Sequence, residues 1–134
     1  MDATGFGYEP GQVPRVDTLS FQADKGLIGL AKDCCSRVNP DINTFVGRVV
    51  SGDQFISDKA KKEWLVKTFQ GYCTEMEGAA IAQACYLNGI PFLIVRAISD
   101  KADDSASVDY PAFEAQAIGH SVNLLTEMIR CYEE

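Results

Sequence analysis

Histidine is almost missing from this sequence, since His120 is the only one among 134 residues. A Ser–His–Asp or Cys–His arrangement and a histidine-based metal site are therefore excluded unless His120 itself takes part. The five cysteines include no Cys-x-x-Cys pair, and their odd number fits reduced thiols better than a disulfide framework or a zinc site. We accordingly expect no metal and no cofactor.

The sequence also lacks an excess of basic residues and a long apolar run. Twelve Lys+Arg against nineteen Asp+Glu give a net charge of -7, so nucleic acids and anionic membranes would repel the chain. The apolar stretch from Ile90 to Val95 stops at Arg96 and is far too short to cross a bilayer. The first residues carry no export signal. We expect a cytoplasmic protein without nucleic-acid or membrane partners.

Apolar residues recur with helical and strand spacing in alternation, and residues 1–20, rich in Gly and Pro, are expected to form a loop. The predicted helices are 24–38, capped by Asp24, 57 to about 68, capped by Ser57, 79–87, and a last one that Asp109 begins; the predicted strands are 45–50, 72–74 and 92–98. This alternation favours a three-layer α/β/α fold. Its sheet would be incomplete, because such sheets usually have about five or six strands.

Three segments follow predicted strands, at the edge where open α/β sheets bind ligands: 51–56, 75–78 and 99–100. Their carboxylates, without a histidine or a metal, favour glycosyl chemistry over acyl transfer. That chemistry needs an acid for the leaving group, and an aspartate can be that acid where its surroundings raise its pKa, as the end of a buried strand could.

Each of these residues also has a purely structural interpretation. Asp100 could cap a turn, and Phe55 could belong to the core. Glu75 and Glu77 could complement the dipole of the helix that follows them. The residues alone leave both interpretations open.

Segments 51–56 (SGDQFI), 74–82 (TEMEGAAIA) and 95–103 (VRAISDKAD) closely resemble motifs of the bacterial 5′-methylthioadenosine/S-adenosylhomocysteine nucleosidases. These enzymes belong to the purine nucleoside phosphorylase-like superfamily. The resemblance implies a three-layer phosphorylase/nucleosidase-like fold and a hydrolase of methionine salvage. It implies cleavage of the N-glycosidic bond of methylthioadenosine and S-adenosylhomocysteine, with release of adenine.

The resemblance also implies roles for individual residues. The catalytic residue would be Asp100, which would protonate purine N7, with Ser99 helping to orient the purine. The substrate-binding residues would be Phe55 (stacking on adenine), Ile56 (backbone contact with the base edge), Met76 and Glu77 (ribose), and Arg96 as a partner of Glu77. Phe6 and Tyr8 would line the pocket of the neighbouring subunit in a homodimer, which places the 1–20 loop at the dimer interface.

The family's chains carry a further N-terminal part, with several strands and the glutamate that activates water. Residues 1–134 therefore resemble the C-terminal portion of a single nucleosidase domain. Two alternatives stay open. A purine nucleoside phosphorylase would need a phosphate site, for which no basic cluster is evident. A non-catalytic chain could bind nucleosides or associate with a partner that supplies the missing strands.

Overall fold

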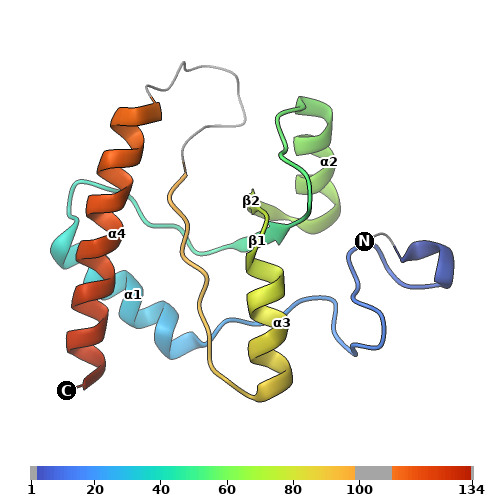
Figure 1. The fold of residues 1–134 in the computed structure, drawn as a ribbon, viewed down its shortest axis with the longest axis horizontal. Helices are drawn as coiled ribbons and strands as arrows, with labels where there is room; N and C mark the ends of the chain where they lie inside the picture. The colour runs from blue at the N-terminus through green and yellow to red at the C-terminus, as the bar shows by residue number, and fades with distance from the viewer. Residues whose placement is uncertain (1–2, 99–109, 134) are drawn as a thin grey trace.

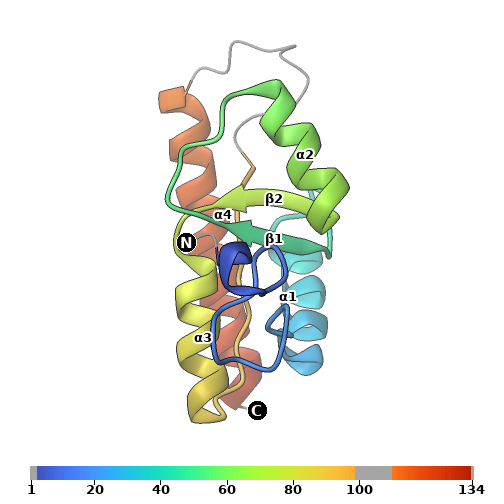
Figure 2. The same cartoon turned by 90° about the vertical axis from the view of Figure 1, so that its right-hand side faces the viewer.

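The computed structural model describes residues 3–98 and 110–133. In chain order the elements are the 3-10 turn η1 (Thr4–Phe6), α1 (Lys25–Val38), β1 (Arg48–Ser51), α2 (Lys59–Phe69), β2 (Gly71–Glu75), α3 (Gly78–Asn88) and α4 (Tyr110–Glu133). α1 and α4 pack together on one side of the strand pair, and the N-terminal loop lies on the opposite side (Figure 1, Figure 2). No described helix combines the length and the apolar character needed to span a bilayer.

The two strands form a parallel pair joined by α2, which is the usual connection between parallel neighbours. Ser51 is aligned with Glu75, so the carboxyl ends of both strands meet at one edge of the sheet. The predicted strand over 45–50 begins only at Arg48. Gly47, just before it, lies so close to the Tyr72 ring that a Cβ atom would overlap the ring.

The helix starts depend on single aspartate side chains. Asp24 accepts a hydrogen bond from the Leu27 amide at 2.8 Å and begins α1, which confirms the predicted cap. The predicted cap of α2, Ser57, is wrong by one residue, because Asp58 accepts from the Lys61 amide at 2.8 Å. Serine and aspartate cap equally well, so the sequence alone did not separate these neighbours.

The predicted helix over 79–87 is present, and α3 extends one residue beyond it at each end. Gly89 follows the helix with a φ of 65°, a left-handed conformation that glycine adopts without steric cost. Its amide donates to carbonyl groups of the last helical turn, which satisfies groups that a helix end leaves unpaired.

The prediction of a strand over 92–98 is wrong for the described part of the chain, because no strand is assigned there. The segment runs from the end of α3 between α4 and the strands (Figure 1). Its backbone is tied to Asp24, whose amide donates to the Phe92 carbonyl at 2.9 Å. Apolar content predicts that this segment is buried, and it does not show which strand the segment pairs with. A strand needs hydrogen bonds to a neighbouring strand, and the described two-stranded sheet does not extend to this segment.

The core of the described residues lies mainly between α1 and α4. Cys34, Cys35 and Leu124 are buried there, and they pack with Leu30, Met128 and Cys131. Asn39, at the end of α1, is 2% exposed and donates to the His120 carbonyl of α4 at 2.9 Å. This hydrogen bond removes most of the cost of burying its amide. Other large apolar side chains stay exposed, among them Val122, Leu125 and Ile129 of α4.

Candidate active site

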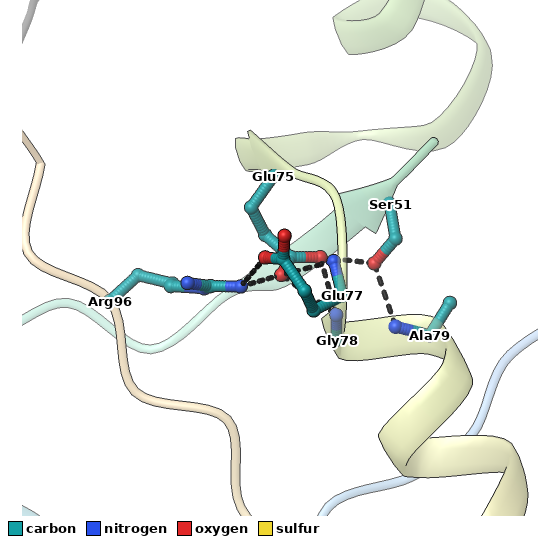
Figure 3. A network of polar contacts seen from close by, with 6 residues as sticks. All are labelled: Ser51, Glu75, Glu77, Gly78, Ala79 and Arg96. Carbon is teal, nitrogen blue, oxygen red and sulfur yellow. Dashed lines mark hydrogen bonds and ion pairs between the residues drawn. The ribbon is translucent and has the colours of Figure 1, made fainter. Parts of the chain in front are cut away.

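A network of charged and polar side chains occupies the edge where β1 and β2 end (Figure 3). Ser51 is the last residue of β1 and donates to Glu75, the last residue of β2, and Arg96 reaches Glu75 from the segment after α3. The prediction that the segments after these two strands share one edge is confirmed by the register. Ser99 and Asp100, which form the third predicted segment, lie outside the described residues.

Glu75 is the centre of this network. Its carboxylate accepts hydrogen bonds from Ser51 Oγ, from the Glu77 amide at 3.1 Å and from the Gly78 amide at 2.7 Å, and it forms an ion pair with Arg96. The side chain is only 8% exposed. Burial by itself raises the pKa of Glu75, but the bonds from Ser51, Arg96 and the two amides outweigh burial and lower it below its ordinary value.

These contacts make Glu75 a poor base for activating water. Its position in the sequence does not support that role either. A carboxylate whose pKa is lowered is a weak proton acceptor, because its hydrogen-bond partners favour the ionised form. The structure instead uses Glu75 to bind the first turn of α3, although the N-cap residue itself is Glu77. The Glu75 carboxylate and Ser51 Oγ accept from the amides of Gly78 and Ala79, the first two residues of that helix. The expected complement to a helix dipole is therefore confirmed for Glu75.

Arg96 joins the buried carboxylate to an exposed one. Its guanidinium pairs with Glu75 and, at 2.8 Å, with Glu77, whose side chain is 65% exposed. The hydrogen bond to Glu75, together with the one to Glu77, raises the pKa of Arg96 further above its ordinary value. The pairing of Arg96 with Glu77 that the sequence suggests is thus present. It leaves a fixed but accessible carboxylate at the strand ends.

The remaining predicted site residues are largely open to solvent. Phe55 is 85% exposed and Met76 is 47% exposed, while Ile56 is half-buried. The interpretation of Phe55 as a core residue is therefore wrong for this structure. Phe6, in η1, is 86% exposed, and Tyr8, just after it, is half-buried. Both lie in the N-terminal loop, on the side of the molecule opposite α4 (Figure 1, Figure 2).

Ser51 has no role that its sequence pattern predicts, although it begins one of the three segments predicted to bind ligands. Its hydroxyl links Glu75 to the Ala79 amide and so ties β1 to the start of α3. The available signal was its position directly after a predicted strand. Only the register of the two strands shows that this position faces Glu75.

Residues 1–130 match the family described as "Phosphorylase superfamily". The chain belongs to this superfamily. It is 37% identical over 135 residues to the 5′-methylthioadenosine/S-adenosylhomocysteine nucleosidase of an Exiguobacterium species, an alignment that covers 100% of this chain and 57% of that relative.

Solved structures agree with the superfamily assignment. The 5′-methylthioadenosine/S-adenosyl homocysteine nucleosidase of Campylobacter jejuni matches with a TM-score of 0.85 and 34% identity, covering 96% of this chain and 55% of that one. The 5′-methylthioadenosine/S-adenosylhomocysteine nucleosidase of Neisseria meningitidis, solved with methylthio-immucillin-A, matches with a TM-score of 0.83 and 36% identity, covering 98% and 56%. The expected α/β phosphorylase/nucleosidase-like fold is thus confirmed. The chain spans a little over half the length of these proteins.

Proposed function

We propose that the protein hydrolyses the N-glycosidic bond of 5′-methylthioadenosine and S-adenosylhomocysteine and releases adenine. The observation that carries this proposal is the Glu77–Arg96 pair beside the capped start of α3, in a superfamily member similar to nucleosidases for these substrates. Arg96 fixes the Glu77 carboxylate while leaving it exposed. A carboxylate held in this way can accept hydrogen bonds from both hydroxyls of a ribose.

The other site residues would divide the work of binding and proton transfer. Phe55, exposed beyond the end of β1, stacks on the purine, and the Ile56 backbone binds the base edge. Met76 packs against the ribose. Asp100, oriented together with Ser99, donates a proton to purine N7, so that adenine leaves as a neutral base while water adds to the sugar carbon.

We further propose a cytoplasmic homodimer that acts in methionine salvage. In this dimer Phe6 and Tyr8 of one subunit line the alkylthio pocket of the other. The exposure of Phe6 on a short turn supports this role, because burial of a large aromatic ring in a subunit contact is energetically favourable.

Adenine release is the measurement that tests the activity. The purified chain is incubated with methylthioadenosine, with and without phosphate, and free adenine is quantified by chromatography. We expect release that does not depend on phosphate and disappears in Asp100→Asn. Phosphate-dependent release with ribose 1-phosphate as product would show a purine nucleoside phosphorylase instead. Near-full activity of Asp100→Asn would refute the role of Asp100.

A second candidate function is association with a partner that supplies β-strands, without catalysis by this chain alone. It is favoured by an apolar stripe on α4 whose members recur at steps of four, three and four residues: Ile118, Val122, Leu125 and Ile129, each more than half exposed. A hollow lined by Leu93, Val95 and three residues of α4 continues this surface onto the segment 92–98, which pairs with no strand among the described residues. Such a spacing suits packing against another secondary-structure element.

Sedimentation velocity shows whether the stripe on α4 carries the association, and ligand binding separates this candidate from the enzyme. An associating chain should form concentration-dependent oligomers that Leu125→Glu weakens, because the new charge would be buried in the contact. It should also gain thermal stability from methylthioadenosine without consuming it. A monodisperse monomer that unfolds cooperatively and releases adenine would exclude the second candidate.

A further inference from the structure

A cluster of sulfur and charged side chains joins α1 to α4 and shares no residue with the candidate active site. Arg37 Nη2, on α1, donates to Cys34 Sγ at 3.4 Å and to Cys131 Sγ, on α4, at 3.0 Å. Cys34 is completely buried and Cys131 is half-buried. Since one nitrogen contacts both sulfurs, the two thiols occupy adjoining positions across the contact between the helices.

A carboxylate completes the cluster. Glu127, one turn before Cys131 on α4, lies 3.6 Å from Arg37 Nη2 and accepts a hydrogen bond from Cys131 Sγ at 3.9 Å. The half-buried thiol therefore has an acceptor for its proton on one side and a cation beside its sulfur on the other. Reactive cysteines in proteins have surroundings of this kind: a nearby cation and partial exposure.

The two thiols differ in a way that suits successive steps. Burial raises the pKa of Cys34 despite the hydrogen bond from Arg37, and the same burial shields this thiol from reagents in solution. Cys131 is within reach of a small oxidant, and Cys34 is within reach only of its neighbours.

We propose that Cys34 and Cys131 form a dithiol site that a small hydroperoxide converts into a disulfide linking α1 to α4. The Cys131 sulfur attacks one oxygen of hydrogen peroxide and the O–O bond breaks, which leaves a sulfenic acid on Cys131 and releases water. The Cys34 sulfur then attacks the oxidised sulfur, and the hydroxyl leaves as a second water with the Cys34 proton. The two thiols lose two electrons and the peroxide gains them. This site is independent of the proposed nucleosidase activity.

Thiol counting and peptide mapping on the full chain test the proposal. The reduced protein is treated with hydrogen peroxide, remaining thiols are alkylated, and the chain is digested without reductant for mass spectrometry. We expect the loss of two of the five thiols, recovery of a peptide pair joined through Cys34 and Cys131, and reversal by dithiothreitol. A pair joined through other cysteines, or Cys131 oxidised to the sulfinic acid with Cys34 still free, would overturn the proposal.

Two variants and one measurement on the unaltered chain sharpen the result. On treatment with peroxide, the Cys131→Ser variant should not lose two thiols together. The Cys85→Ser variant, which changes a half-buried cysteine of α3, should still lose two. The map of the unaltered chain decides the proposal even if Cys131→Ser does not fold. The oxidised chain should also melt at a higher temperature than the reduced one, because the disulfide closes a long loop.

Discussion

Replacing Glu75 by glutamine tests whether the candidate site depends on one buried charge. The carboxylate is 8% exposed, pairs with Arg96 and accepts three further hydrogen bonds. Glutamine keeps one acceptor oxygen, and its NH₂ group would face groups that are themselves donors. Because glutamine is uncharged, Arg96 also loses its buried ion-pair partner. Breaking a buried pair costs about 3–5 kcal/mol, and Arg96 is one-third exposed. We therefore expect a loss near the lower end, about 3 kcal/mol.

Glu77→Gln is the matched control, because Glu77 pairs with the same guanidinium but is 65% exposed. An exposed ion pair contributes less than about 1 kcal/mol. Urea unfolding followed by circular dichroism gives the free energies, provided that the slope of the transition is unchanged among the proteins. Equal losses in the two variants, or a loss below about 1 kcal/mol in Glu75→Gln, would refute the central role of Glu75.

Three further results are expected. Because the pKa of Glu75 is lowered in the folded chain, its stabilisation is complete above the ordinary carboxyl pKa and is lost on acidification; the gap in urea midpoint between wild type and Glu75→Gln should narrow below about pH 4. Gly47→Ala should cost about 1–3 kcal/mol in urea unfolding because the methyl group meets the Tyr72 ring, whereas Gly119→Ala, in open space on α4, should be neutral or stabilising. Asp24→Ala should cost about 1 kcal/mol in the same assay by removing the cap of α1.

The helices were predictable because their signals are local. A cap such as Asp24 or a stop such as Gly89 acts within a few residues of itself, so a single sequence carries the information. Where two adjacent residues were equally good caps, the prediction failed by one position, at Ser57 and Asp58. The extent of β1 and the state of 92–98 were not predictable in the same way, since a strand is defined by pairing with residues far away in the chain.

The candidate site shows the same division. The sequence placed residues 51–56 and 75–78 at one edge, because parallel strands end on the same side of a sheet. It assigned Arg96 to Glu77, and that pair is present. It missed that the principal partner of Arg96 is buried Glu75 and that Ser51 completes the network. These contacts depend on the register of β1 against β2 and on the path of the chain after α3, neither of which leaves a local pattern.

The charges of this network are themselves an argument for the proposed chemistry. Glu75 and Glu77 share the single guanidinium of Arg96, so the cluster keeps a net negative charge. The buried carboxylate of Glu75 is already hydrogen-bonded to the start of α3. Glu77 is therefore the carboxylate of this cluster whose negative charge a ligand can reach. Cleavage of an N-glycosidic bond builds positive charge on the sugar, and a fixed carboxylate beside the ribose stabilises that charge more strongly in the transition state than in the neutral substrate. Glu77→Gln should consequently lower kcat more than it raises KM in an active enzyme, whereas a carboxylate that only bound the ribose hydroxyls would change mainly KM.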